Sequence, residues 1–438
     1  MKLPGHLTLL KLSYLLLAGL PLLVAALAHK RAGRGLWIEL GVGLGFVGFS
    51  VLALQFALTG KFRHLSVVLG LDALLHFHRQ IGLVAFGLIL AHVGILSAAD
   101  SNYAAFLDPR VDWMRALALW VVLGALILLI VTTYWRIPLG IPYEWWRIGH
   151  GMLALAVLSI GLAHILRVGW YVDEPWKQSI WIAGTLCAVG LLVYARVWKP
   201  YRARRRRWTV NAVRPEKGDA WTLELVPDGH EGMRFRAGQF VWLVLGDSPF
   251  SQHQHPFSIS SSEHRTPELE ITVKALGDFT SRIGEVEVGT HAYIDGPYGS
   301  FVLDDATEEV VCVAGGVGIT PIMSILRTMR DSGREIPVTL VYGFPAPDQA
   351  ILLKELEELA HETGWLDLVR LAEYAEPDWT GERGLVTPEF LDRHLPPEAP
   401  GLRYFICGPD PMMDGVESYL SSKGVPLERV RSERFNIA

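Results

Sequence analysis

The chain has 438 residues, of which 50% are hydrophobic and only 19% are charged. A net charge of −5 argues against a general affinity for nucleic acid, and the three scattered cysteines argue against a disulfide framework or an iron–sulfur cluster. The apolar residues are concentrated before about residue 200. This distribution predicts a membrane half followed by a soluble half.

Six apolar segments in the first half each have about the 20 residues that a membrane-spanning helix requires. We expect spans at residues 7–28, 36–58, 71–97, 113–135, 144–167 and 178–198. The arginine-rich run 202–207 directly follows the sixth span, and positive residues there favour the cytoplasm and contact with lipid headgroups. Both termini and the soluble half would then be cytoplasmic, in a multi-pass protein of the plasma membrane.

The first span allows two interpretations. Lys30, Arg31 and Arg34 follow it, although this topology places them outside. The small residues of "AALAHK" also fit a signal-peptide cleavage site. We favour a retained helix, and cleavage would leave the remaining topology unchanged.

Histidines occur in pairs, fourteen residues apart, in the third and fifth spans. His78 and His92 therefore lie on nearly the same face of one helix, about 21 Å apart, and His150 and His164 repeat this arrangement. Packing between helices would explain one such histidine, whereas two levels of two imidazoles suit two haems with axial histidines. The sequence has no C-x-x-C-H motif, which predicts b-type haems.

Other polar residues near these pairs have less distinctive positions. His64 and His76 are interpreted as surface groups or as neighbours of the ligands near the inner face. Arg79, Arg147 and Arg167 lie beside the ligand positions, where they would either pair with haem propionates or extend to the membrane surface.

After the basic run, short strands alternate with turns, which predicts a small antiparallel β-barrel. It contains "FRAGQFVWL" at 235–243 and "HPFSISSS" at 255–262. These motifs resemble the FAD-binding barrel of the ferredoxin-reductase-like superfamily, and "HPFS" resembles the form found in the NADPH oxidase and ferric reductase families. The resemblance implies that the isoalloxazine is lined by His255, Pro256, Phe257 and Ser258. The Ser258 hydroxyl would lie near the reactive flavin nitrogen.

A second segment, "VKALGDFTSRI" at 273–283, resembles the flavin diphosphate segment of the same families. Lys274 would neutralise phosphate, Gly277 would permit a close backbone approach, and Thr280 would cap a short helix. An ordinary strand and turn would explain either fragment alone. Their order and spacing favour a flavin site.

From about residue 304, buried strands alternate with helices, as in a parallel sheet. We expect strands at "EVVCVAGG", "PVTLVYGF", "LDLVRLAE" and "RYFICGP", with helices after the first, second and fourth, one of them at 348–360 with a solvated charged face. The first strand leads into a phosphate-binding turn and helix N-terminus. Its residues are Gly315, Gly316 and Gly318 in the turn, Thr320 as the helix cap and Pro321 as the first helical residue.

Three further pieces resemble the nicotinamide domain of this superfamily. "GPYGSF" at 296–301 ends the barrel, "YGF" closes the second parallel strand, and "CGPDPMM" closes the last. By this resemblance, Tyr342 and Gly343 belong to the nucleotide site, while Cys407 and Gly408 approach the nicotinamide. Phe435 would stack on the flavin, or it is an ordinary hydrophobic residue of an end strand.

The expected fold is a six-helix transmembrane haem bundle (1–200), an FAD-binding antiparallel β-barrel (201–303) and an α/β parallel-sheet nucleotide-binding domain (304–438). From about residue 70 onward, the chain resembles a single-chain prokaryotic NADPH oxidase or a related ferric reductase. Electrons would pass from cytoplasmic NADPH or NADH to FAD, then to an inner haem held by His78 and His150. An outer haem held by His92 and His164 would deliver them outside.

The acceptor allows several interpretations. Oxygen, giving superoxide, is favoured, and the alternatives are a ferric chelate or a role as an electron-feeding subunit for a partner protein or quinone. Leu96 stands where some oxidases carry a further histidine, which weakens an oxygen-tuned pocket. "YGFPAPDQ" supplies no arginine for a 2′-phosphate, although Arg370 would be able to reach one. The sequence has no long regulatory extension, so we expect that no regulatory subunit is required.

Overall fold

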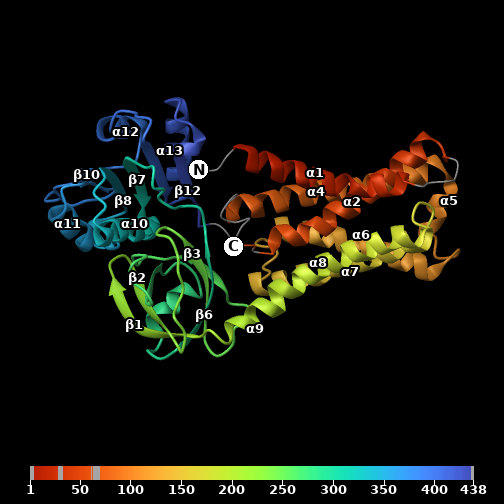
Figure 1. Cartoon of the computed structure of the whole chain (residues 1–438), viewed down its shortest axis with the longest axis horizontal. Helices are drawn as coiled ribbons and strands as arrows, with labels where there is room; N and C mark the ends of the chain where they lie inside the picture. Colours follow the sequence, from red (N-terminus) through yellow and green to blue (C-terminus); the bar gives the residue numbers. More distant parts are fainter. Residues whose placement is uncertain (1–3, 28–32, 61, 63–69, 436–438) are drawn as a thin grey trace. The chain divides into compact units, whose positions relative to one another are not determined.

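The computed structural model describes residues 4–27, 33–60, 62 and 70–435. His64, Lys30 and Arg31 lie outside the described residues. The chain divides into two compact units, a helical unit that ends at Trp198 and a second unit, mainly from Lys199 onward, that contains two β-sheets (Figure 1). The boundary between Trp198 and Lys199 coincides with the predicted end of the sixth span.

Within the described part of the chain, the helical unit has six helices long and apolar enough to cross a membrane. They are α1 (Pro4–Ala26), α2 (Leu36–Thr59), α4 (Leu71–Ala99), α6 (Trp113–Tyr134), α7 (Tyr143–Val168) and α8 (Pro175–Val193). Each predicted span falls on one of these helices. The last helix is longer than predicted, because it continues through a π-helical turn, η2 (Tyr194–Trp198), into α9 (Lys199–Ala203). Two short elements, α5 (Ser101–Ala104) and η1 (Ala105–Leu107), connect α4 to α6.

The first helix is an integral part of this bundle. Ser50 of α2 donates a hydrogen bond to the carbonyl oxygen of Leu17 in α1, at 2.9 Å. The buried ammonium group of Lys177 in α8 donates to the carbonyl oxygen of Ala25 at 3.3 Å. Because a buried charge needs such a partner, the end of α1 and the start of α8 are held together.

The second unit begins with a six-stranded antiparallel sheet. Its strands are β1 (Trp208–Glu216), β2 (Ala220–Pro227), β3 (Phe240–Leu245), β4 (His255–Ser258), β5 (Leu269–Lys274) and β6 (His291–Tyr298), in the order β4-β3-β6-β1-β2-β5. Ile259, directly after β4, forms a bridge with Ile271 of β5, and this bridge joins the two edges of the sheet. The predicted barrel therefore has one buried core, which includes Val210, Leu223 and Ile271.

The rest of the unit is a six-stranded parallel sheet between two layers of helices. The strands are β7 (Glu309–Gly315), β8 (Val338–Phe344), β9 (Leu366–Ala372), β10 (Glu382–Arg383), β11 (Leu402–Cys407) and β12 (Val430–Glu433), in the order β10-β9-β8-β7-β11-β12. The helices are α10 (Ile319–Ser332), α11 (Leu353–Glu362), α12 (Pro388–His394) and α13 (Asp410–Ser422). Alternate residues of β7 enter two separate cores, one with α10 and α11 and one with α12 and α13.

The four predicted parallel strands are present, whereas β10, β12 and α12 were not predicted. The two strands have only two and four residues, so the sequence pattern is too short to show them. The helix predicted at 348–360 begins only after Leu352, whose left-handed backbone (φ 57°) interrupts it. Its charged face was expected to contact only solvent, but Glu355 forms an ion pair with Arg327 and Glu357 forms one with Arg370.

Candidate functional site

Of the four histidines predicted as ligands, the two nearer the beginnings of α4 and α7 lie together. The ring centroids of His78 and His150 are 6.2 Å apart, and the Trp146 ring lies 5.1 Å from that of His150. The Nδ1 atoms of both histidines are buried and have no hydrogen-bond partner among the described residues. This pair, the 78/150 pair, therefore holds two imidazoles with unsatisfied hydrogen-bonding capacity.

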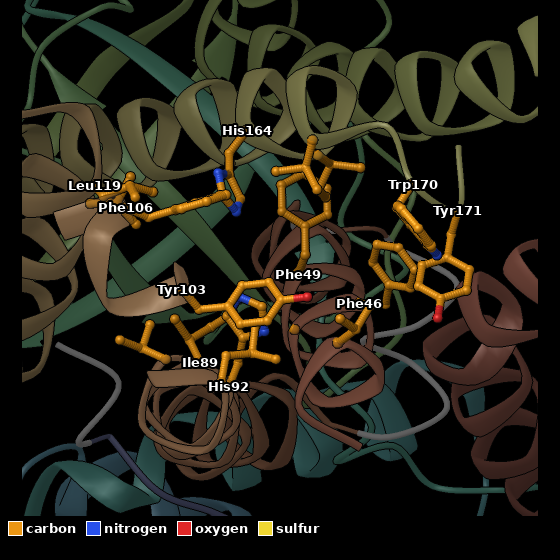
Figure 2. Close-up of a pocket in the computed structure, with 18 of the residues that line it drawn as sticks. Phe46, Phe49, Ile89, His92, Tyr103, Phe106, Leu119, His164, Trp170 and Tyr171 are labelled. Carbon is orange, nitrogen blue, oxygen red and sulfur yellow. The ribbon is translucent and has the colours of Figure 1, made fainter. Parts of the chain in front are cut away.

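The other two predicted histidines, His92 and His164, line a single cavity within the helical unit and point into it (Figure 2). We call them the 92/164 pair. The Nδ1 atom of His92 lies 2.8 Å from the carbonyl oxygen of Gly41, so a protonated Nδ1 would donate there and leave the Nε2 lone pair free. A Cβ atom at Gly45 would lie only 2.6 Å from this Nδ1. Glycine at position 45 therefore makes room for the His92 ring against α2.

The walls of this cavity are mainly aliphatic and aromatic, and two arginines lie at or beside them. Arg34 lines the cavity, lies 4.7 Å from the centre of the Trp170 ring and donates to the Tyr103 hydroxyl at 2.9 Å. Arg115 lies 4.2 Å from the centre of the Phe106 ring. The Nε atoms of both arginines are buried without a partner among the described residues. One signal in the sequence could have found them, since Arg34 directly precedes the predicted span 36–58 and Arg115 lies near the start of the span 113–135.

The arginines singled out in the sequence have other neighbours. Arg167 forms an ion pair with Asp112, at 3.3 Å, and Asp112 caps α6. Arg79 and Arg147 each lie over a tyrosine ring, at 5.8 and 5.7 Å. His76 is exposed on α4 and belongs to neither pair.

The "HPFS" residues form strand β4. The His255 ring stacks on Phe279 with 4.3 Å between centroids, and the Phe257 ring is 6.2 Å from that of Phe279. Ser258 is 3% exposed, and its hydroxyl has no hydrogen-bond partner among the described residues. A buried hydroxyl without a partner is unfavourable, so Ser258 is well placed to bind a polar atom of a ligand.

The segment predicted to hold a diphosphate is the turn after β5. Thr280 does not cap a helix as predicted, because it is the first residue of the 3-10 helix η3 (Thr280–Glu285). Its hydroxyl instead accepts hydrogen bonds from the amides of Leu276 and Gly277, both at 2.9 Å, and so closes the preceding turn. A Cβ atom at Gly277 would meet nothing within 4 Å, and Lys274 ends β5 beside this open backbone.

The glycine turn after β7 lies directly against the end of β11. A Cβ atom at Gly318 would lie 2.1 Å from the carbonyl oxygen of Cys407, and one at Gly408 would lie 2.9 Å from the amide nitrogen of Gly315. Gly316 has a left-handed backbone, with φ of 54°. Glycine is therefore required where these two strand ends meet. The two motifs that were found separately in the sequence lie side by side in the fold.

The predicted start of the following helix is wrong by two residues. A 3-10 turn, η4 (Gly316–Gly318), leads directly into α10 at Ile319, so Thr320 and Pro321 are its second and third residues. The Thr320 hydroxyl donates to the carbonyl oxygen of Val317 at 3.0 Å and caps no amide. Proline is still tolerated, because amides in the first turn have no partner within the helix.

Several predicted nucleotide residues are buried. Tyr342 is 0% exposed, and its hydroxyl donates to the carbonyl oxygen of Ile351 at 3.0 Å, with the carbonyl oxygen of Gly316 at 3.3 Å. Burial raises the pKa of Tyr342, so it remains a donor and supports the glycine turn from behind. The Cys407 side chain is also 0% exposed, whereas Phe435 is 38% exposed.

A buried ion cluster joins the barrel to the parallel sheet. The Glu270 carboxylate of β5 is 2% exposed and lies within 3.0 Å of guanidinium nitrogens from Arg214, Arg265 and Arg327. Arg327 belongs to α10 and also donates to the carbonyl oxygen of Ser260, at 2.7 Å. The flavin-type and nucleotide-type folds are thus fixed to each other through this arginine.

The fold and these sites define an electron-transfer oxidoreductase of the membrane, with a flavin domain and a pyridine-nucleotide domain. Three family models match the chain: a ferric reductase like transmembrane component at 44–161, an FAD-binding domain at 219–302 and an oxidoreductase NAD-binding domain at 312–418. The chain belongs to the NADPH oxidase/ferric reductase-like family with domains of the ferredoxin–NADP reductase type.

Relatives that match about half of the chain include known reductases. The reductase component of propane 2-monooxygenase from Mycolicibacterium smegmatis is 32% identical over 238 residues, which are 52% of this chain and 67% of that protein. NADH-cytochrome b5 reductase 1 from Neosartorya fischeri is 28% identical over 188 residues, 40% of this chain and 61% of that protein. The FAD/NAD-binding domain of nitric oxide dioxygenase from Vibrio cholerae is 24% identical, with a TM-score of 0.47, over 52% of this chain and 98% of that structure.

Proposed function

We propose that the chain passes electrons from cytoplasmic NAD(P)H, through FAD and two b-type haems, to oxygen on the outer side of the plasma membrane, with superoxide as the product. The arrangement of the 78/150 and 92/164 pairs carries this proposal. Each pair joins the same two helices, and the two levels are separated by fourteen residues in both.

His78 and His150 would hold one haem through their imidazole nitrogens. Imidazole nitrogens bind metal ions at roughly 2 Å, so two rings on opposite sides of one ion have centroids roughly 6 Å apart. The observed separation is 6.2 Å. Among the described residues, no group of three or more His, Cys, Asp or Glu side chains is arranged to hold a metal ion alone. A haem supplies four nitrogen ligands itself and needs only two from the protein.

The 92/164 pair fits the same role. The contact between His92 and the Gly41 carbonyl oxygen resembles the second hydrogen bond that metal-binding histidines usually make, and it would fix the orientation of the ring. The unpartnered, buried Nε atoms of Arg34 and Arg115 would donate to the carboxylates of a haem at this level. When bound, the two haems would carry single electrons across a distance too long for one transfer.

The soluble unit would hold the flavin and the nucleotide. His255, Phe257 and Phe279 provide stacked rings beside the flavin position, and Ser258 would form a hydrogen bond with a polar atom of its ring. The glycine turn 315–318 and the N-terminus of α10 would bind the pyrophosphate of the nucleotide. When bound, FAD converts hydride transfer from the nucleotide into single-electron transfer.

The lining of the cavity at the 92/164 pair, in which a haem would be held, favours oxygen as the acceptor beside that haem. Its lining is mainly aliphatic and aromatic, with Phe46, Phe49 and Phe106 among its residues. Such a lining admits a small apolar molecule more readily than a large charged one. The second candidate is an anionic ferric chelate, because Arg34 lines the same cavity and would attract its negative charge if it did not pair with a haem carboxylate.

Proteoliposomes would test the proposed function directly. Vesicles would contain trapped cytochrome c, with or without trapped superoxide dismutase, and NADH or NADPH would be added outside. We expect reduction of the trapped cytochrome, with most of it suppressed by trapped dismutase. Reduction that dismutase leaves unchanged would contradict superoxide as the product, and a lack of reduction by a flavin-loaded and haem-loaded chain would contradict transfer across the membrane.

A further inference from the structure

The proposed function does not yet say which part of the nucleotide would lie at the carboxyl ends of β8 and β9. The following inference rests on the proposed function. If the nicotinamide approaches Cys407 at the end of β11 and the pyrophosphate binds after β7, the adenosine end must extend the other way along the sheet. The strand order β9-β8-β7-β11 then places it over β8 and β9.

Strands β8, β9 and β10 and the loops that follow them contain two cationic residues, and both are engaged. Arg370 of β9 forms an ion pair with Glu357 of α11, at 2.6 Å, and donates to the Thr380 hydroxyl at 3.2 Å. Arg383 of β10 donates to main-chain carbonyl oxygens in the loop 376–379. Neither guanidinium group is therefore available to a 2′-phosphate without losing these contacts.

The same region is rich in carboxylates. Asp348 follows β8, and Glu373, Glu376 and Asp378 follow β9. Glu373 comes directly after the last residue of β9, and its carboxylate raises the pKa of the exposed Tyr374 through a hydrogen bond. A carboxylate at this edge accepts a hydrogen bond from a ribose 2′-hydroxyl, but it repels a 2′-phosphate.

We propose that this site selects NADH over NADPH, with Glu373 accepting the ribose 2′-hydroxyl and Glu357 holding Arg370 away from a 2′-phosphate. The selection has an attractive part and a repulsive part, which is how binding sites usually achieve specificity. The exposed Tyr374 lies beside Glu373, where its ring would cover the adenine.

Binding of nucleotide fragments tests this proposal without electron transfer. Isothermal titration of the FAD-loaded full chain would compare ADP-ribose with 2′-phospho-ADP-ribose. We expect ADP-ribose to bind at least about tenfold more tightly, as like-charge contacts at an interface predict. Equal binding of the two fragments, or tighter binding of the phosphorylated one, would overturn the proposal. If neither fragment binds, the proposed nucleotide site itself fails.

Two variants separate the residues involved. Glu357→Gln releases Arg370, so we expect tighter binding of 2′-phospho-ADP-ribose and little change for ADP-ribose. Glu358→Gln is the matched control, because Glu358 pairs with the exposed Lys354 on the same helix. Glu373→Gln should weaken the binding of ADP-ribose and reduce the preference. If the Glu357 and Glu358 variants behave alike, Arg370 does not take part in selection.

Discussion

The helical unit and the second unit, which contains the two β-sheets, position their functional side chains in different ways. In the helical unit, four histidines follow from the regular geometry of two helices, fourteen residues apart on each. In the soluble unit, the nucleotide site depends on contacts between strand ends that are far apart in the chain, such as Gly318 against the Cys407 carbonyl oxygen. Replacing one of these histidines should therefore remove a ligand of a bound cofactor, whereas replacing Gly318 should displace the backbone.

The histidine pairs give the largest expected effect and the strongest test of this contrast. His150→Ala should remove the haem of the 78/150 pair, and His92→Ala should remove that of the 92/164 pair, so each variant retains about half of the haem. The pyridine haemochrome assay on purified protein measures this content. His76→Ala is the control, because His76 is exposed on α4, the helix that also carries His92. Full haem content in the His150 or His92 variant would refute the assignment of that ligand.

The ion cluster between the two folds of the soluble unit should have the next largest effect. Arg327→Met leaves the buried Glu270 carboxylate with less compensation, and breaking a buried ion pair costs about 3–5 kcal/mol. Release of FAD fluorescence on heating would report the lower stability. Arg330→Met serves as a control, since Arg330 is exposed on the same helix and pairs with its neighbour Asp331. Equal melting of the two variants would contradict a structural role for the cluster.

The contact between Gly318 and the Cys407 carbonyl oxygen should have the third largest effect on stability. Gly318→Ala places a methyl group against the carbonyl oxygen of Cys407, and forced overpacking costs about 1–3 kcal/mol. The midpoint of denaturant unfolding should fall, and nucleotide binding should weaken. Gly415→Ala in α13 meets no atom within 4 Å and should raise the midpoint instead. An unchanged midpoint for the Gly318 variant would show that the backbone can move to accept the methyl group, and would contradict the requirement for glycine at this position.

The unpartnered hydroxyl of Ser258 should have a smaller, local effect. Ser258→Ala should retain FAD and slow its reduction by nucleotide up to about tenfold, the effect of one lost hydrogen bond. Stopped-flow absorbance under anaerobic conditions measures this rate, and Ser421→Ala on the exposed side of α13 is the control. Identical rates in both variants would mean that Ser258 does not contact the flavin.

The smallest expected effect is a pH dependence of stability in the barrel. A hydrogen bond from Asn211, assisted by Arg214, lowers the pKa of Glu224 below its usual value. The stabilisation by this ionised carboxylate is therefore present above the pKa of the unfolded state, about 4.3, and is lost as the pH falls through the lower folded value. Urea unfolding should distinguish Glu224→Gln from the parent chain at pH 6, and the difference should shrink below pH 4. A difference that grows on acidification would contradict this sign.

The sequence predicts the helical unit better than the soluble sites. Helical spacing places the two histidines of each helix on one face, and once α4 and α7 pack together His78 lies near His150. The place of Arg34 beside Tyr103 and Trp170 could not be predicted, since the three residues come from separate connecting segments. Likewise, the start of α10 was misplaced because the 3-10 turn at Gly316–Gly318 has no distinctive sequence pattern.

The most direct test of electron transfer between the two units is the visible spectrum of the purified, FAD-loaded chain during anaerobic addition of NADH. We predict b-type haem bands that correspond to two haems per chain and that become reduced only when FAD is present. A folded chain that binds FAD and accepts electrons from NADH, but contains no haem or leaves its haem oxidised, would contradict the account.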